Sequence, residues 1–316
     1  MPTLSVIILS HNRRDALLRT LTELFALTSV DHQGSSPAIP ADFLELIVVD
    51  NASKDGTVEQ VRVQFPVAIY PNLVLLALPE NVAIEGFNLG AARASGQYLL
   101  ILDDDAWPDR DSLGHALNLL EQERSIAGVA LLPVHPRTNT PEWRFAASAG
   151  DQLIRRFPVF GCANIVRASA WQAVGGYERE FLLYRNDVDL ALKLLGAGFD
   201  VAHNPGWFAW HDSPGATRKS DRWLRLATRN WVWLARRHAQ RWWQLLLAIG
   251  LHIPWTIREA GLSASRLGLV WAGLSDGLRT SPPGLPNSVR RSDALWRLIG
   301  MQVRTKYSRR VSIKHS

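Results

Sequence analysis

The sequence is poor in cysteine and lacks a long uninterrupted apolar stretch. The 316 residues include one cysteine, Cys162, so an intrachain disulfide is excluded. Cysteine usage therefore gives no indication of an oxidising compartment. The first ten residues lack the basic n-region and cleavage site of a signal peptide and are typical of a first β-strand. Residues 242–257 are strongly apolar but include a glutamine, a histidine and a proline, and they are fewer than the ~20 that span a membrane. We therefore expect a cytoplasmic protein.

Several short motifs are absent as well. No helix-turn-helix, zinc or aromatic-platform motif supports nucleic-acid binding, so we expect no nucleic-acid partner. No Gly-x-Gly-x-x-Gly follows the first predicted strand at residues 4–9, which counts against a dinucleotide-binding enzyme. The segment after that strand, Ser10-His11-Asn12-Arg13, is not a glycine-rich basic loop, which counts against a sugar-phosphate nucleotidyltransferase.

Charge is unevenly distributed along the chain. Residues 1–212 contain 16 Lys/Arg and 25 Asp/Glu, a net charge of −9, whereas residues 213–316 contain 19 Lys/Arg and 4 Asp/Glu, a net charge of +15. Eight of the 13 tryptophans also fall in the second part. This contrast predicts two regions with different partners, residues 1–212 and a basic, Trp-rich helical region at 213–316.

Apolar runs alternate with helical patterns through the first part of the chain. The predicted strands are at residues 4–9, 44–49, within 67–76, 99–102, 126–134, 157–167 and 199–202. The predicted helices are at residues 15–27, 58–65, 86–96, 111–123, 168–174 and 185–195. This order predicts βαβ units and a parallel sheet flanked by helices, an α/β fold. Residues 28–40 are a predicted surface loop, and Asn204-Pro205 is expected to turn the chain out of the last strand.

The strand at residues 99–102 ends in three carboxylates, Asp103, Asp104 and Asp105. In open α/β sheets, ligands bind in the crevice outside the carboxyl ends of the strands. Three adjacent carboxylates repel one another, so keeping them ionised favours a cation such as Mg²⁺ or Mn²⁺, which commonly bridges carboxylates to substrate phosphates. The stretch indicates a metal–diphosphate site, with an acidic loop that binds nothing as the alternative.

Two further acids, Asp187 and Asp189, lie in the first turn of a predicted helix. The positive end of the helix dipole favours carboxylates at that position. They are candidates for a functional role, and the alternative is that they only stabilise the start of the helix.

These pieces resemble the family 2 glycosyltransferases of the bacterial surface-polysaccharide, rhamnosyltransferase-like type. The matching segments, in chain order, are residues 5–13, 48–57, Asn81 with 86–96, 102–108, 175–178, 184–190, and Pro205 with His211. The likeness spans roughly residues 3–212. It implies the GT-A fold, a Rossmann-like and mostly parallel sheet flanked by helices, with an acceptor-binding half from about residue 125 and an α-helical C-terminal extension.

The resemblance also implies roles for individual side chains. Asp103, Asp105 and His211 are the implied ligands of a divalent metal, Mn²⁺ or Mg²⁺, and Asp187 is the implied catalytic base. A structural role for His211 is the alternative. The implied donor-binding residues are Ser10, Asn12, Asp50, Asn81, Arg93 and Asp104. Arg93 can equally pair with a surface carboxylate.

Together these roles imply a metal-dependent inverting glycosyltransferase. It would move a sugar from a nucleotide-diphosphate donor to a hydroxyl of a glycan or lipid-linked acceptor in cell-surface glycan synthesis. The alternatives are a non-catalytic nucleotide-sugar-binding or scaffold protein with the same fold, and a sugar-phosphate nucleotidyltransferase. Asn186 stands where the family usually has a glutamate, and residues 83–88 differ from the usual Gly-Phe-Ala-Gly-Gly-Asn, so contacts there are expected to differ.

The basic helices predicted within residues 222–280 combine arginine with tryptophan and leucine. Such helices can lie in the membrane interface, where each basic residue contributes about 1 kcal/mol of attraction to an anionic leaflet. We therefore expect peripheral contact with the inner face of the cell membrane. The alternatives are that these helices pack on the first region or form an oligomer interface.

Overall fold

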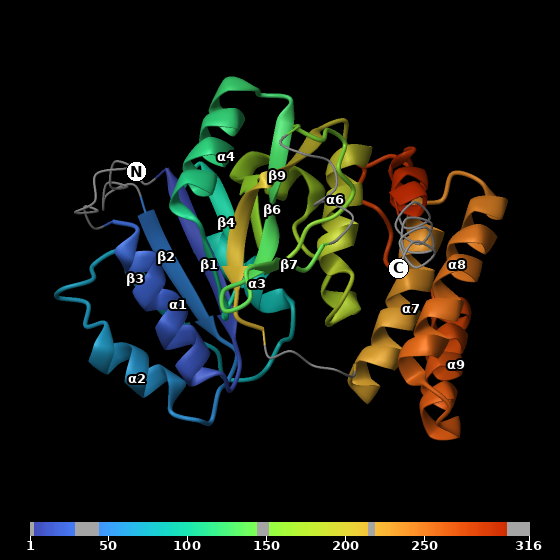
Figure 1. The fold of residues 1–316 in the computed structure, drawn as a ribbon, viewed down its shortest axis with the longest axis horizontal. Helices are drawn as coiled ribbons and strands as arrows, with labels where there is room; N and C mark the ends of the chain where they lie inside the picture. Colours follow the sequence, from blue (N-terminus) through green and yellow to red (C-terminus); the bar gives the residue numbers. More distant parts are fainter. Residues whose placement is uncertain (1–2, 29–43, 144–151, 214–218, 302–316) are drawn as a thin grey trace.

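The computed structural model describes residues 3–28, 44–143, 152–213 and 219–301 of the chain. Among these residues, nine strands form one sheet with helices on both faces (Figure 1). The strand order is β3-β2-β1-β4-β8-β6-β9-β5, and β7 pairs with β6. The predicted α/β fold is confirmed. The predicted loop at residues 28–40 lies almost entirely outside the described residues, as does the basic tail after residue 301.

The first half of the sheet is parallel, as predicted. Its strands are β1 (Leu4–Ser10), β2 (Leu44–Asp50), β3 (Leu73–Ala77) and β4 (Tyr98–Asp103). The connecting helices are α1 (Arg14–Ala26), α2 (Thr57–Gln64) and α3 (Glu85–Arg93). Register pairs Ser10 with Asp50 and Leu9 with Asp103. Because parallel strands end at the same edge, polar side chains from three separate segments meet there.

The second half of the sheet is mixed. β8 runs antiparallel to both β4 and β6, β6 is parallel to β9, and β5 pairs antiparallel with β9. The strands are β5 (Ala106–Pro108), β6 (Ile126–His135), β7 (Thr140–Pro141), β8 (Ala163–Arg167) and β9 (Asp200–His211). The helices are α4 (Arg110–Gln122), α5 (Ala168–Val174), the short 3₁₀ helix η2 (Arg179–Phe181) and α6 (Asn186–Gly196). β4 therefore lies at the boundary between the parallel half of the sheet and the mixed half.

Both faces of the sheet are buried because side chains alternate along each strand. On β1, Val6 and Ile8 pack in one apolar cluster with α1 and α4, whereas Ile7 packs in the other with α3, α5 and α6. A Cβ atom on Gly90 of α3 would come within 2.5 Å of the Ile7 side chain. The small residues of α3 thus allow that helix to lie directly on the sheet.

The prediction that Asn204-Pro205 turns the chain out of its strand is wrong. β9 continues to His211, and its pairing with β6 shifts register after His203 to accommodate the extra residues. Asn204 Oδ1 accepts a hydrogen bond from Gly206 N at 2.8 Å within this irregular segment. Proline is tolerated there because a bulge interrupts the ladder of backbone hydrogen bonds.

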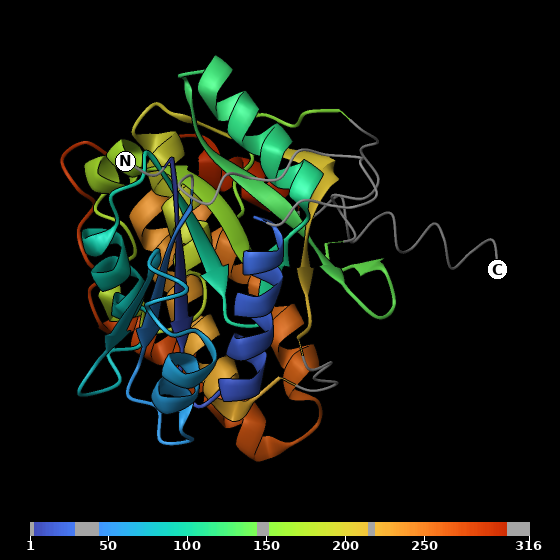
Figure 2. The ribbon, with the colours of Figure 1, turned by 90° about the vertical axis from the view of Figure 1, so that its left-hand side faces the viewer.

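Three C-terminal helices, α7 (Asp221–His238), α8 (Trp242–Ala260) and α9 (Ala264–Arg279), pack together beside the sheet (Figure 1). In Figure 2 they lie behind the sheet, on the side away from α2. Trp231 and Leu234 of α7 belong to the same apolar cluster as Leu190 and Leu194 of α6, so α7 shares a core with the α/β part. None of the helices in the described ranges combines the length and hydropathy that a membrane span requires.

Candidate functional site

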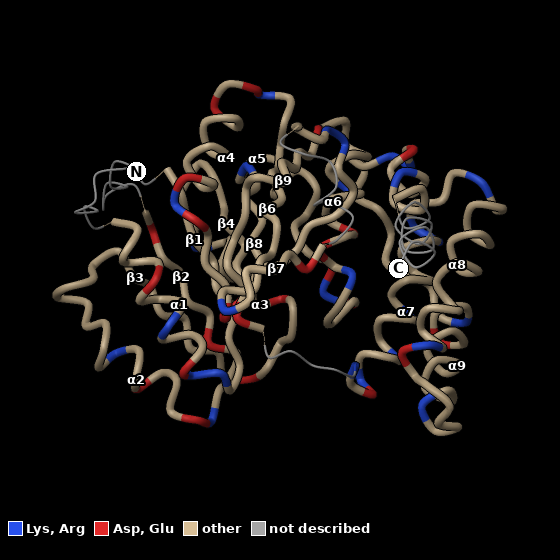
Figure 3. The backbone as a smooth tube through the Cα atoms, viewed as in Figure 1, with Lys and Arg blue, Asp and Glu red and all other residues tan. Residues whose placement is uncertain are grey.

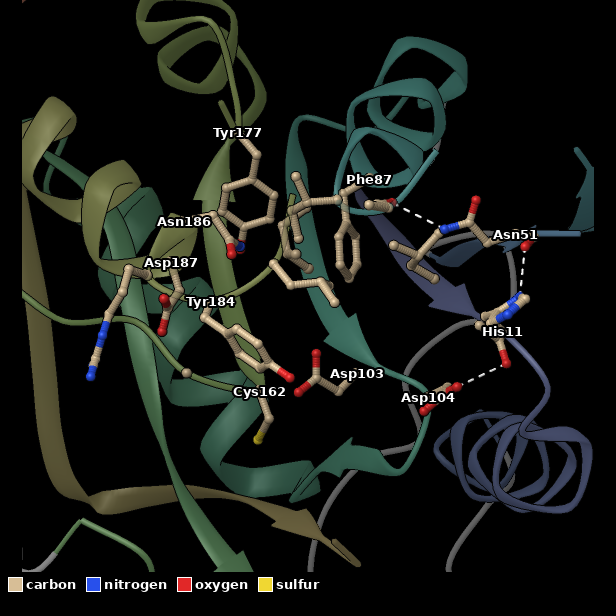
Figure 4. A pocket seen from close by; sticks show the side chains of 18 of the residues that line it. His11, Asn51, Phe87, Asp103, Asp104, Cys162, Tyr177, Tyr184, Asn186 and Asp187 are labelled. Carbon is tan, nitrogen blue, oxygen red and sulfur yellow. Dashed lines mark hydrogen bonds between the residues drawn. The ribbon is translucent and has the colours of Figure 1, made fainter. Parts of the chain in front are cut away.

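A cleft of about 740 Å³ opens at the edge of the sheet where β1, β2 and β4 end. Figure 4 shows His11 and Asn51 at one end, Asp103 in the middle, and Asp187 toward the other end. The predicted site residues that line the cleft are Ser10, Asn81, Asp103, Asp104, Asp187 and His211. The fold thus gathers into one space residues that lie far apart in the sequence.

The three carboxylates after β4, here called the aspartate cluster (Asp103, Asp104 and Asp105), have different surroundings. Asp103 is exposed to the cleft, whereas Asp104 and Asp105 are buried. Ser10 Oγ donates a hydrogen bond to Asp104 Oδ2 at 2.8 Å. The Arg13 guanidinium lies 3.2 Å from Asp104 Oδ1 and 2.6 Å from Asp105 Oδ2. Arg13 is not among the predicted site residues, yet it partly neutralises the cluster.

The walls of the cleft change the proton affinity of this cluster. Loss of hydration between those walls raises the pKa of Asp103 to about 7, although the side chain stays open to the cleft and His211 opposes the shift. Burial raises the pKa of Asp104 to about 6 despite Arg13. Burial acts in the same direction on Asp105, but hydrogen bonds and charges from His211 and Arg13 hold its pKa below the usual value. The cluster therefore reaches its full negative charge near neutral pH only with a cation close by.

His211, at the end of β9, lies between two carboxylates. Its Nε2 is 3.3 Å from Asp105 Oδ1, and its Nδ1 is 2.7 Å from Glu142 Oε1. Burial lowers the pKa of this imidazole, but the two hydrogen bonds and the nearby charges outweigh it and raise the pKa to about 10. Glu142 directly follows β7 and is a further site residue that no local sequence pattern marks. A carboxylate on the second ring nitrogen is the usual way to orient a metal-binding histidine.

The side chains at this point fit a divalent metal ion. One oxygen each of Asp103 and Asp105 and one nitrogen of His211 all lie within 4.8 Å of one another. Two carboxylates and one imidazole suit Mn²⁺, whereas Mg²⁺ prefers oxygen ligands alone. The predicted ligands are thus brought together by two strands, β4 and β9, that are far apart in the chain.

At the opposite end, Asp50 terminates β2. It is buried, its Oδ2 accepts a hydrogen bond from Ser53 N at 3.0 Å, and its Oδ1 has no hydrogen-bond partner among the described residues. The next residue, Asn51, lines the cleft, with its carbonyl bound by His11 Nδ1 at 2.8 Å and its Nδ2 donating to Ala83 O at 3.1 Å. Acceptor capacity therefore remains free at the end of this strand.

Three predicted donor-binding residues, Asp50, Asn12 and Arg93, lie outside the lining of the cleft. Asn12 is exposed, and it joins the loops after β1 and β2 by accepting from Lys54 N at 2.7 Å and donating its own N–H to Ser53 Oγ at 2.9 Å. Arg93 is the exposed last residue of α3, whereas that helix borders the cleft through Phe87. At 1.5 Å per residue, Arg93 lies ~9 Å farther along the helix axis.

Helix α6 directs its two N-terminal acids to different surroundings. Asp187 lines the cleft, and burial raises its pKa, while the first backbone N–H groups of the helix and the charge of Arg185 oppose that shift. Asp189 is fully buried, with His238 Nε2 at 2.8 Å and Arg237 Nε at 3.1 Å from its Oδ1. Burial alone would raise its pKa, but these partners lower the pKa to about 2. Asp187 therefore faces the cleft, and Asp189 joins α6 to α7.

The end of the cleft next to α7 carries three cations, Arg185, Lys219 and Arg222, here called the basic end. Arg185 and the preceding Tyr184 adopt left-handed backbone conformations, with φ of 69° and 68°. Non-glycine residues rarely adopt this conformation, and such strain clusters at functional sites. Lys219 and Arg222 belong to the positively charged second region, whereas Arg185 belongs to the segment 184–190 that carries the family resemblance.

Comparison with protein-family models matches residues 5–181 to "Glycosyl transferase family 2" and residues 98–282 to "Glycosyl transferase family group 2". The first match alone covers more than half of the chain. Both agree with the predicted family.

Individual proteins give the same result. The chain is 31% identical over 211 residues to the glycosyltransferase AglE of Haloferax volcanii, covering 64% of each protein. It is 32% identical over 126 residues to an uncharacterized glycosyltransferase of Haemophilus influenzae, covering 39% of this chain and 36% of that one. The chain thus spans less than two thirds of the length of either relative.

Among solved structures, the mannosyltransferase PcManGT of Pyrobaculum calidifontis, in complex with GDP-Man and Mn²⁺, aligns with a TM-score of 0.60 and 20% identity. The alignment covers 96% of this chain and 84% of that one. At this level of identity the likeness is one of fold.

Proposed function

The chain belongs to glycosyltransferase family 2, and we propose that it transfers a sugar from a nucleoside diphosphate donor to an acceptor hydroxyl with inversion at the anomeric carbon. The observation that carries this proposal is that one cleft holds both the aspartate cluster with His211 and the carboxylate of Asp187. The first set suits a departing diphosphate, and the second suits an incoming hydroxyl. No feature of the cleft favours a scaffold protein or a nucleotidyltransferase.

Asp103, Asp105 and His211 hold a divalent cation in this proposal, Mn²⁺ in preference to Mg²⁺. When bound, the cation supplies Lewis-acid stabilisation of the charge on the leaving diphosphate. PcManGT, which has the same fold, is described with Mn²⁺ and GDP-Man, and this supports Mn²⁺ here. Glu142 orients His211 through its second ring nitrogen.

The nucleoside occupies the end of the cleft lined by Asn51 and Asn81, with Asp50 buried next to Asn51. The unpartnered Oδ1 of Asp50 supports this placement, because a buried carboxylate oxygen is stabilised by a donor such as a ribose hydroxyl or a base N–H. Asp104 contacts the donor sugar or ribose, as the family resemblance implies. Since Ser10 and Arg13 already donate to Asp104, these two side chains fix its orientation for that contact.

Asp187 takes the proton of the acceptor hydroxyl as that oxygen attacks the anomeric carbon opposite the leaving phosphate. Burial raises its pKa, which strengthens it as a base. A single attack on one face inverts the configuration. Glycosidases need two carboxylates because their leaving group requires protonation, whereas a metal-bound diphosphate does not.

We propose further that α8 places the protein on the cytoplasmic face of an anionic membrane, where a lipid-linked acceptor or growing surface glycan is available. Residues 242–257 contain no charged side chain, and Trp242 and Leu246 are 74% and 60% exposed. Arg241 and Arg258 flank this stretch and are exposed. Figure 3 shows further basic residues along α7 to α9. An apolar helix face bordered by cations fits a lipid surface with negative headgroups.

Flotation with liposomes tests the membrane contact. The full chain should float with vesicles of phosphatidylglycerol and phosphatidylethanolamine, and a Trp242→Ser, Leu246→Ser variant should float several-fold less. Ile69→Ser, at a 69% exposed position far along the chain near α2, is the matched control and should float like the unmodified protein. Equal flotation of all three proteins would rule out this surface.

A screen of nucleotide sugars for thermal stabilisation, with and without Mn²⁺, tests the catalytic proposal. At least one donor should raise the melting temperature more with Mn²⁺ than with EDTA, because ligand that binds only the folded chain stabilises it. Failure of every nucleoside diphosphate and nucleotide sugar to bind in either condition would overturn the proposal.

A further inference from the structure

The basic end contains two cations, Lys219 and Arg222, without an acidic partner among the described residues, and a third, Arg185, whose charge is felt by Asp187. Arg185, Lys219 and Arg222 all line the cleft, and among the described residues none of the three forms an ion pair. Arg222 is exposed and forms no hydrogen bond with any residue that the structure describes, and Lys219 Nζ lies 5.6 Å from the Trp223 ring centroid. The space next to Asp187 is thus positively charged on the side of α7.

Arg185 is the most constrained of these cations. Its guanidinium carbon is 5.4 Å from the ring centroids of both Trp231 and Trp255, so the side chain is held between α7 and α8. Its Nε atom is buried and has no hydrogen-bond partner. A buried cation with an unsatisfied N–H group destabilises a protein unless a partner is present.

Other buried arginines of the molecule do have acidic partners. Arg237 contacts Asp189 and Glu178, with the Glu178 oxygen at 3.1 Å. Arg266 pairs with Asp221 at the start of α7. Arg185 forms no such ion pair among the described residues; the carboxylate that acts on its charge is Asp187, and both residues line the cleft. An anion from outside the chain would complete the contacts of Arg185.

We infer that the basic end binds a phosphate or diphosphate group carried by the acceptor. Three cations match a multiply charged group better than a single carboxylate, and the planar fork of Arg185 suits phosphate oxygens. The donor's diphosphate belongs to the aspartate cluster in the middle of the cleft, whereas the basic end adjoins the base Asp187 and thus the incoming hydroxyl. This inference rests on the proposed function and specifies the chemical class of its acceptor.

Calorimetric titration of the full chain in EDTA tests the inference, because EDTA removes the metal that would hold a diphosphate at the aspartate cluster. The probes are geranyl diphosphate and glucose 1-phosphate, with geraniol and methyl glucoside as their uncharged counterparts. The variants are Arg185→Gln and Arg222→Gln. Arg62→Gln, which removes the same charge from an exposed position on α2, is the matched control.

At least one phosphate probe should bind, and both uncharged probes should not. Arg185→Gln should weaken that binding ~10-fold or more, as expected for a lost charge-assisted hydrogen bond, and Arg222→Gln about 2- to 5-fold. Tighter binding of geranyl diphosphate identifies a lipid-linked acceptor, and tighter binding of glucose 1-phosphate identifies a phosphorylated glycan. Because Arg222 forms no hydrogen bond or ion pair among the described residues, Arg222→Gln decides the matter if Arg185→Gln does not fold.

No binding of either phosphate probe, or equal binding by both variants and Arg62→Gln, would overturn the inference. The donor screen separates this from failure of the proposed function. If a donor binds with Mn²⁺ while the phosphate probes fail, only the acceptor class is wrong. If no donor binds, the proposed function is wrong whatever the probes do.

Discussion

The aspartate cluster and the basic end differ in how their charges are satisfied. Asp104 and Asp105 contact Arg13 and His211, and all four residues belong to the first 212. Lys219 and Arg222 of the basic end have no acidic partner among the described residues, and both come from the C-terminal region. The charges of the aspartate cluster are therefore partly satisfied by residues of the first region, whereas the two cations from the C-terminal region are available to a ligand in the cleft. The first region, which is negatively charged overall, contributes the aspartate cluster to the cleft. The second region, which is positively charged overall, contributes Lys219 and Arg222 to the same cleft.

A smaller version of the same contrast lies within one turn of α6. Asp187 faces the cleft with a raised pKa, and Asp189 is buried among cations with a pKa of about 2. The two carboxylates are only two residues apart, but they point in different directions from the helix. One therefore lies in the cleft and the other in the buried contact with α7. Substitutions at these positions should affect activity and stability separately.

The largest expected effect is that of Asp187→Asn on transfer. Loss of the general base should lower kcat by about 10²–10⁴-fold while donor binding and the melting temperature change little. Single-turnover kinetics and donor calorimetry measure the two quantities. Glu80→Gln, at an exposed position with no side-chain contacts, is the control and should retain activity. Full transfer by Asp187→Asn would remove this residue from the role of base.

The pH dependence of kcat should reflect the same group. Because burial raises the pKa of Asp187 above its ordinary value, the ionised base is lost at a higher pH than for an exposed aspartate. At saturating metal, kcat should rise with pH along an acid limb centred above pH ~4. An acid limb below that value would contradict the buried environment of this carboxylate.

The next largest effect is that of Asp189→Asn on stability. Removing one partner from a buried ionic cluster costs about 3–5 kcal/mol, and urea denaturation measures it. Since the folded pKa is lowered to about 2, the stabilisation by Asp189 is present above pH ~4 and is lost as pH falls toward 2. Asp276→Asn breaks an exposed pair with Arg225 and should cost less than about 1 kcal/mol. Equal losses for both variants would contradict the anchoring role.

Glu142→Gln should have an intermediate effect confined to the metal. Its carboxylate holds the second nitrogen of His211, and loss of such support typically lowers metal affinity ~10- to 100-fold. Mn²⁺ titration followed by electron paramagnetic resonance measures this, with the exposed Glu59→Gln as control. Unchanged Mn²⁺ affinity in Glu142→Gln would show that His211 is oriented by other contacts or does not bind the metal.

The smallest expected effect is that of Ser10→Ala. It removes one buried hydrogen bond to Asp104, which keeps its contact with Arg13, so the loss of stability should be about 1 kcal/mol. Urea denaturation beside the exposed Ser265→Ala variant measures it. A loss above about 3 kcal/mol would mean that Arg13 does not compensate.

The donor half of the fold follows from local sequence patterns, and the acceptor half does not. The strands β1, β2 and β4 are short apolar runs with polar exits, so the meeting of Ser10, Asp50 and Asp103 follows from the parallel order alone. Glu142, by contrast, reaches His211 because β9 passes through an irregular segment at Asn204. No local pattern encodes such a long-range pairing.

The basic end was beyond prediction for a related reason. Arg185 enters the cleft through a left-handed turn, and Lys219 and Arg222 reach it because α7 packs on α6. Arg93 shows the opposite case. It belongs to a segment that matches the family, but it lies at the end of α3 that is farther from the cleft. Tertiary packing, which short sequence windows do not contain, decides these positions.

Anomalous diffraction from crystals grown with Mn²⁺ and the nucleoside diphosphate identified by the donor screen tests the central claim most directly. A manganese peak should lie within bonding distance of Asp103, Asp105 and a diphosphate oxygen, with Asp187 on the far side of the sugar position. A nucleotide seated in the cleft with its manganese bound elsewhere, or with no manganese at all, would contradict the claim.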